Sequence, residues 1–261
     1  MRRHDIAVNR GLLARSPRFA AYVAQTPTNW GLVPYNPMAG DAALDTVNAL
    51  IALDAETLAQ QAAQHVATAC HFSDAIMLAI AVRSKGLWTD RIATEVDERV
   101  SAKQRVPHQG VISLWSREES GTANIAREAA AEAVRVMWHA MHGVADTRGG
   151  VVAWWRGGVV ACEGLAYALG ELLGGLGPYA TPNTPEETVA VIEAFEVLGD
   201  TRQAGEIAGV LYGDAAAEAM GWTPLGIPQY AGYRWAVNHA TGQLRARGAA
   251  AALAAGTLHI G

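Results

Sequence analysis

The sequences NIAREAAAEAVRVMWHAMH, residues 124–142, and GVVAWWRGGVVACEGLAYALGE, residues 150–171, decide the fold of this chain. Both space their apolar residues at helical intervals, so they predict two long helices joined by residues 143–149. Gly157 and Gly158 interrupt the second helix. Each glycine costs about 1 kcal/mol relative to alanine, which indicates a close approach of another backbone. We expect the rest of the chain to be organised around this helix pair.

Polar residues of the first helix share one face or lie close to it, because they recur at intervals of three or four. They are Glu128, Glu132, Arg135 and His139. Two interpretations stay open: a solvated stripe of ion pairs, or a polar face that lines a cleft. On the second helix, Glu163 lies in a small and apolar run, and glutamate is almost never fully buried without a partner. We therefore predict that Glu163 is buried with a cationic or metal partner, with His139 and Arg135 as candidates.

The composition predicts a globular chain with a sizeable core, since 51% of the 261 residues are hydrophobic and 17% are charged. A formal net charge of −5 without a basic block argues against a nucleic-acid partner. No apolar run reaches the ~18 residues of a membrane-spanning helix, and the N-terminus is a poor signal peptide. We expect a cytoplasmic protein without a membrane partner. Cys70 and Cys162 form no disulfide framework or Cys-x-x-Cys pair, and are expected to be buried thiols.

The remaining patterns predict a mixture of helices and short strands. Residues 1–40 look irregular because prolines recur, whereas residues 41–70 predict helix, with a break near Asp54 that would divide it in two. Further expected elements are strands at 75–82 and 110–115, a solvated surface helix at 89–100, a helix beginning at Pro185 and a long helix from Gln229. We predict one α+β domain over residues 1–261, mostly helical with a small sheet.

Three stretches resemble one family. They are Gly110–Trp115 followed by the helix at Asn124, the run Glu163-Gly164-Leu165-Ala166, and a C-terminal segment from Tyr212 to Tyr233 that ends in Gly226-Ile227-Pro228-Gln229-Tyr230-Ala231-Gly232-Tyr233. Together they are similar to the predicted zinc-dependent proteases of unknown function, whose members resemble zincins. The resemblance covers about residues 110–240. It implies a zincin-like fold with Glu163 as the third metal ligand.

The family motif His-Glu-x-x-His is degenerate in this chain. One register reads Ala131-Glu132-Ala133-Val134-Arg135, which keeps the glutamate and loses both histidines; a register shifted to residues 135–139 keeps only His139. In zinc peptidases two histidines hold the metal, and the glutamate takes a proton from the bound water. The resemblance therefore implies the fold and argues against the family's activity.

Three function classes remain open. The first is a non-peptidase enzyme that acts on a small molecule in a cleft between helices 124–142 and 150–171. There His139 would be the general acid/base, Glu163 its orienting carboxylate and Arg135 an anion clamp, with Glu132 and Tyr233 completing the site. The alternative is a catalytically inactive binding or regulatory pseudo-peptidase.

The third class is a metal- or haem-dependent enzyme with relocated ligands. A rebuilt zinc or iron site would use His139, His142 and Glu163, and a haem would take one of these histidines as axial ligand. A true metallopeptidase with displaced ligands belongs to the same class.

Overall fold

The computed structural model describes residues 32–34, 40–83, 88–96, 99, 108–115, 117–142, 156–198 and 203–255. The strands are β1 (Leu32–Pro34), β2 (Met77–Val82) and β3 (Gln109–Leu114). The helices are α4 (Gly40–Ala52), α5 (Ala55–Ala69), α6 (Trp88–Glu95), α7 (Thr122–His142), α8 (Arg156–Gly174), α9 (Pro185–Leu198), α10 (Ala204–Tyr212), α11 (Asp214–Met220), α12 (Ala231–Arg247) and α13 (Ala249–Ala254), with a 3-10 turn at Arg117–Ser120. The predicted α+β class, mostly helical with a small sheet, is confirmed.

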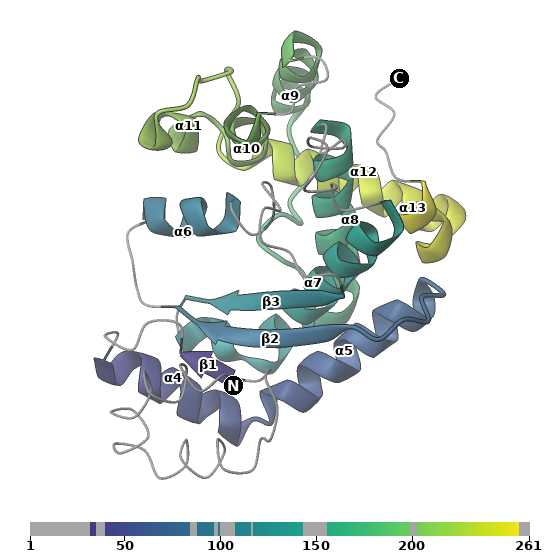
Figure 1. Cartoon of the computed structure of the whole chain (residues 1–261). Coiled ribbons are helices and arrows are strands. Elements are labelled where there is room, and N and C mark those ends of the chain that lie inside the picture. The colour runs from purple at the N-terminus through teal and green to yellow at the C-terminus, as the bar shows by residue number, and fades with distance from the viewer. Residues whose placement is uncertain are drawn as a thin grey trace, which may run out of the picture.

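The three strands form a parallel sheet in the order β1-β2-β3. The helices α4 and α5 connect β1 to β2, and α6 lies between β2 and β3 in the chain. Figure 1 shows α4 and α5 below the sheet and the C-terminal helices α9 to α12 above it. Along one side, apolar side chains of α4, β2, β3 and α7 form a hydrophobic cluster that includes Leu50, Ile80, Ile112 and Ile125.

The central helix α7 connects the helices beside the sheet to the C-terminal helices, because it contacts both α5 and α8. The helix α8 in turn contacts α12, and these elements share the larger hydrophobic cluster. The predicted pair of long helices is thus confirmed. Residues 143–155 lie outside the described part of the chain, and α8 runs through Gly157 and Gly158 without the predicted interruption.

Glycines allow these helices to approach closely at other positions. A Cβ at Gly164 would overlap the backbone carbonyl oxygen of Ala236 on α12, and a Cβ at Gly232 would overlap that of Val210 on α10. The family-like runs at 163–166 and 226–233 therefore contain packing glycines. Their small size is required because any larger residue would push the helices apart.

Local geometry agrees with several predicted boundaries. Asp54 adopts a left-handed conformation with φ of 54° and separates α4 from α5, as the predicted break requires. Thr184 accepts a hydrogen bond from the backbone N–H of Glu187, while the Glu187 carboxylate accepts one from the N–H of Thr184. This reciprocal cap fixes the start of α9. Most of the predicted irregular segment 1–40 lies outside the described residues.

Cys70 and Cys162 are buried and neither forms a disulfide, as predicted. Burial raises the pKa of the Cys70 thiol to about 11, so this thiol is protonated at neutral pH. Among the described helices, none combines the length and apolar character needed to cross a bilayer.

Candidate functional site

The side chain of Glu163 lies in the interior between α7 and α8 and is fully buried. Arg135 donates to both of its carboxylate oxygens, from Nε to Oε1 at 2.8 Å and from Nη2 to Oε2 at 2.9 Å. Two parallel charge-assisted bonds are the strongest geometry that an arginine–carboxylate pair adopts. The prediction that Glu163 is buried beside a cation is confirmed, and Arg135 is the partner.

Glu132 extends this pair to the sheet. Arg135 donates from Nη1 to its Oε2 at 3.1 Å, and the backbone N–H of Val111 donates to its Oε1 at 3.3 Å. Glycine at position 110 makes room, since a Cβ there would lie 2.6 Å from the Cγ of Glu132. The carboxylate therefore ties α7 to the edge strand β3 while it balances charge on Arg135.

The charge of Arg135 is permanent in this environment. Burial lowers the pKa of its guanidinium, but the adjacent Glu163 carboxylate more than offsets this, so the pKa lies well above its usual value. Only 1% of the residue's surface is exposed. Arg135 thus acts as a fixed cation between the two carboxylates.

A second buried pair lies nearby. Arg99 approaches Glu95 with 3.4 Å between Nη1 and Oε2, and the hydroxyl of Tyr212 donates to the same Oε2 at 2.8 Å. Arg91 bridges Glu95 to Glu119, at 2.9 Å from each carboxylate. Burial raises the pKa of Glu95, but the charges of Arg99 and Arg91 and the Tyr212 bond outweigh it, so the net pKa is lowered.

Tyrosines connect the two ionic pairs. Arg99 donates to the hydroxyl of Tyr167 at 2.7 Å, and the guanidiniums of Arg99 and Arg135 lie 5.8 and 5.2 Å from its ring centroid. Tyr233 donates to Tyr212 at 3.3 Å and stacks on Tyr179 with ring centroids 4.4 Å apart. Burial raises the pKa of each of these four hydroxyls, so all are neutral hydrogen-bonding groups.

The five predicted catalytic residues are all buried, so none of them faces solvent. They are Glu132, Arg135, His139, Glu163 and Tyr233, and each is at most 5% exposed. Their side chains fill the interior, because the helices approach too closely for solvent to reach them. The solvated-stripe interpretation is wrong for the same reason, since α7 is buried continuously from Ala129 to His139.

The structure does not assemble the predicted metal site from His139, His142 and Glu163. His139 is buried, whereas His142 is exposed, with its Nε2 2.8 Å from the carbonyl oxygen of Leu253 and its ring 4.6 Å from that of Trp138. Both oxygens of Glu163 already bind Arg135. In the described part of the chain, no group of three His, Cys, Asp or Glu residues could hold a metal ion.

The residues at the positions that the resemblance would assign to the zinc ligands also do not fit zinc. In the first register the two histidine positions hold Ala131, which has no donor, and Arg135, whose guanidinium has no free lone pair. Structural and catalytic zinc sites need at least three protein ligands. A haem axial ligand is not tested and stays a prediction.

Sequence reasoning missed the second ionic pair. Residues 89–100 were predicted as a solvated surface helix because of their charges, but Ile92, Glu95 and Arg99 are buried. The available signal was the spacing of Arg91, Glu95 and Arg99 at intervals of four, which places them on one helical face. Their partners Tyr167 and Tyr212 lie too far along the chain to be predicted.

The C-terminal motif around 226–233 builds a loop and places Tyr233. Asp214 accepts hydrogen bonds from the backbone N–H groups of Leu225 and Gly226, at 2.8 and 3.0 Å. Gly226 and Tyr230 have positive φ, at 80° and 60°, and close the loop before α12 begins. This motif therefore has a structural task, which is to place the buried Tyr233 against Tyr212.

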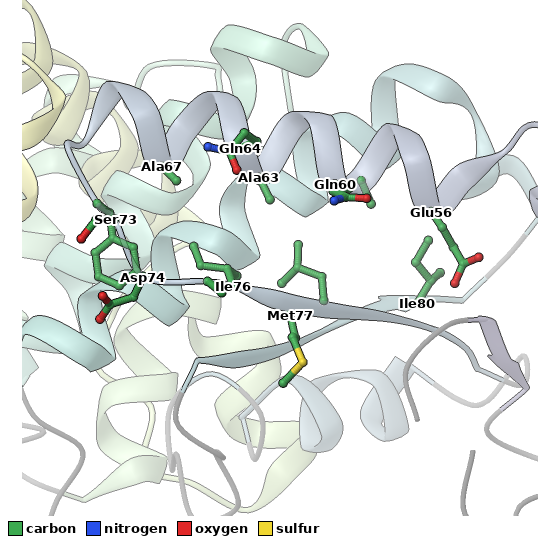
Figure 2. Close-up of a pocket in the computed structure, with 14 residues that line it drawn as sticks. Glu56, Gln60, Ala63, Gln64, Ala67, Ser73, Asp74, Ile76, Met77 and Ile80 are labelled. Atoms are coloured by element: carbon green, nitrogen blue, oxygen red, sulfur yellow. The ribbon is translucent and has the colours of Figure 1, made fainter. Parts of the chain in front are cut away.

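A separate hollow of about 520 Å³ lies between α5 and β2. Figure 2 shows helix α5 along one side and the segment from Ser73 to Ile80 along the other. None of the buried network residues lines it. The sequence contained no motif that pointed to this hollow.

Comparison with family models, curated proteins and solved structures finds no match to this chain. The geometry of the buried network and of the hollow therefore carries the functional argument.

Proposed function

We propose that this chain is a binding protein without peptidase activity, built on a zincin-like scaffold in which the guanidinium of Arg135 takes the place of a catalytic metal. The observation that carries this proposal is the two-bond pairing of Arg135 with Glu163 in the solvent-excluded interior. Both carboxylate oxygens are engaged, so Glu163 is not available as a ligand or as a base.

The register that aligns Ala131–Arg135 with His-Glu-x-x-His relates this pairing to a zinc-peptidase site. Glu132 stands at the position of the motif glutamate, Arg135 at the second histidine and Glu163 at the third ligand. A zinc peptidase needs the metal as Lewis acid and the glutamate as proton acceptor for its bound water. Here Glu132 instead accepts bonds from Arg135 and from the backbone of Val111. The side chains at these three positions form a buried ionic network that connects α7 to α8 and to β3.

The enzyme hypothesis has less support than the binding hypothesis. A small-molecule substrate would have to reach His139, Glu163 and Tyr233 through α7 and α8, where each side chain is at most 5% exposed. A general base must lie within hydrogen-bond reach of the proton that it removes. The hollow between α5 and β2 offers accessible surface, but it contains no member of the buried network. Binding at the surface is therefore favoured over catalysis inside.

Peptidase assays test the first half of this proposal. Casein and a peptide library are incubated with the full chain in the presence of zinc, and we expect no cleavage that a chelator abolishes. Chelator-sensitive cleavage by the purified chain would overturn the proposal.

Restoring the two motif histidines tests the second half of the proposal, which is the alignment of Ala131–Arg135 with His-Glu-x-x-His. The double variant Ala131→His/Arg135→His combines two histidines with Glu132 and Glu163, and we expect it to bind zinc at least about 100-fold more tightly than the original chain. The control Ala131→Gln/Arg135→Gln should not gain affinity. Arg135→His alone provides a second variant that does not enlarge position 131. A folded double variant without any gain in zinc affinity would refute the assigned register.

A further inference from the structure

The helix α9 has apolar side chains on two opposite faces. Its inner face buries Val191 and Phe195, and the helix contacts α10 and α12. Its outer face presents Val189, which is 51% exposed, and Val197, which is 79% exposed. Figure 1 shows α9 at the top edge of the molecule, above α10 and α12. A surface helix normally has its apolar residues on one face, and a helix that is apolar on several faces is normally covered on each.

The exposed valines belong to a continuous stripe. Val189, Glu193 and Val197 are four residues apart and therefore follow one line along the helix, and Glu196 lies beside this line. We call these four residues the outer stripe. With a rise of about 1.5 Å per residue, the two valines lie about 12 Å apart along the helix axis. Spacings of three, four and seven residues are those at which one helix packs on another.

The outer stripe carries negative charge that the rest of the helix does not balance. The segment from Pro185 to Leu198 contains no lysine, arginine or histidine, and both Glu193 and Glu196 are exposed. Among the α9 glutamates, the described residues provide an ion pair only to Glu187, through Arg234.

The positions of Glu193 and Glu196 are unfavourable in the isolated chain. Both lie in the last two turns of α9, where the partial negative charge of the helix carbonyl groups favours cations over anions. They are also three residues apart, a spacing at which like charges repel each other. A cation placed beside the outer stripe would relieve both effects at once.

The sign of this charge decides between possible occupants. A second copy of the chain in a two-fold contact would place Glu193 and Glu196 against the same carboxylates of its partner. Nucleic acids and anionic lipid surfaces carry negative charge and are repelled. A basic helix with apolar residues suits both features of the stripe, since it covers the valines and supplies the cations.

We propose that the outer stripe of α9 binds a basic amphipathic helix of a partner protein. Apolar side chains of that helix pack on Val189 and Val197, and its lysine or arginine side chains pair with Glu193 and Glu196. Apolar contacts supply affinity in this mode of recognition, and the charges select the partner. The inference rests on the proposed binding function, and it names the surface and the partner class.

The first experiment titrates the full chain into a fluorescent helical probe, with binding followed by anisotropy. The probe is an acetylated and amidated peptide of three copies of the heptad Leu-Ala-Ala-Leu-Lys-Ala-Lys. With glutamate in place of every lysine, the peptide should bind at least about tenfold more weakly, because like charges then meet. A proline in the middle heptad breaks the probe helix and should weaken binding at least about fivefold. No binding of the lysine probe, or equally tight binding of either altered peptide, overturns the proposal.

Variants of the chain test whether the probe occupies the outer stripe. Glu193→Gln and Glu196→Gln keep the side-chain shape, and each should weaken binding of the lysine probe at least about twofold. Val197→Gln removes an apolar contact and should weaken it at least about threefold. Glu218→Gln, at an exposed position of α11, is the matched control and should bind normally. Unchanged affinity in all three α9 variants would overturn the proposal.

Sedimentation of the full chain distinguishes a partner helix from a second copy. We expect Val197→Gln to leave the sedimentation coefficient of the chain unchanged. Self-association that this variant abolishes would mean that a second copy covers the outer stripe, which overturns the proposal. None of these measurements involves α7 or α8, so their failure leaves the peptidase and zinc assays as independent tests of the proposed function.

Discussion

Arg135 and Glu163, 28 residues apart in the chain, bind each other through two parallel N–H···O bonds at 2.8 and 2.9 Å. Neither residue is more than 1% exposed. A buried ion pair adds little net stability relative to apolar residues of the same size, yet breaking it leaves an uncompensated charge in the interior. The pair therefore acts chiefly as a constraint on how α7 and α8 meet.

Glu163→Gln should destabilise the fold strongly. The substitution keeps the shape but replaces the carboxylate that accepts two of the Arg135 hydrogen bonds, and it leaves Glu132 as the carboxylate beside the guanidinium, at an expected cost of about 3–5 kcal/mol. Urea unfolding followed by circular dichroism measures this cost. The control Glu193→Gln changes an exposed glutamate and should stay within about 0.5 kcal/mol. A Glu163→Gln variant as stable as the control would contradict the buried pair.

The double variant Arg135→Gln/Glu163→Gln should cost less than the sum of the two single variants. Arg135→Gln removes the cation beside both Glu163 and Glu132, whereas the double change leaves only the Glu132 carboxylate without it, so we expect a coupling of about 1–3 kcal/mol. A complete set of four unfolding curves gives this value. Strict additivity would show that the two side chains do not interact in solution.

The second pair predicts a loss of stability in acid. The folded pKa of Glu95 is lowered, so its contribution is complete above its unfolded pKa of about 4.3 and is lost as pH falls through the folded value. Between about pH 5 and about pH 3 the original chain should therefore lose more stability than Glu95→Gln, which has no proton to gain. Unfolding curves across this range test the difference. Parallel losses in the two proteins would argue against a lowered pKa.

Tyr212→Phe should cost about 1.5–3 kcal/mol, the usual worth of a hydrogen bond to a charged group. The change removes the hydroxyl that donates to Glu95 at 2.8 Å and accepts from Tyr233 at 3.3 Å. Tyr230→Phe is a matched control, because the hydroxyl of Tyr230 instead accepts a bond of 3.3 Å from the exposed Trp88. Thermal unfolding compares the two. Equal losses of stability in the two variants would mean that the hydrogen bond from Tyr212 to Glu95 contributes no more than the bond between Trp88 and Tyr230.

Gly164→Ala and Gly242→Ala should act in opposite directions. Both glycines are helical, but a Cβ at Gly164 meets the backbone of Ala236, and one at Gly242 meets nothing within 4 Å. We expect a loss of about 1–3 kcal/mol for the first and a gain of up to about 1 kcal/mol for the second. Chemical unfolding gives both values. A tolerated alanine at position 164 would show that α8 and α12 are further apart.

The burial of Glu163 could be predicted because its neighbours in the chain are small and apolar. The residues adjacent in sequence are enough for this prediction. The choice between His139 and Arg135 as its partner could not, since both lie on the same helix one turn apart. Their reach decides it: the guanidinium spans the distance to both carboxylate oxygens. The sequence correctly predicted the helix pair and two of the strands for the same local reason.

The stretch 89–100 was predicted wrongly as a solvated surface helix, because charged residues at helical spacing usually face solvent. In this chain Tyr167 and Tyr212, 68 and 117 residues away from their partners Arg99 and Glu95, satisfy those polar groups inside the core. Such pairings depend on how helices pack in space. The hollow between α5 and β2 arises in the same way, from a strand and a helix that are adjacent only after folding.

The cation between α7 and α8 is the side chain of Arg135, which is synthesised as part of the chain. This determines when and how the ionic network of Arg135, Glu163 and Glu132 forms. Because this cation is part of the polypeptide, formation of the ionic network needs no metal transport, no metal-loading step and no pool of free ions. It also cannot be exchanged for a competing ion or withdrawn by starvation. Only mutation of Arg135 or unfolding of the helices can empty its place beside Glu163.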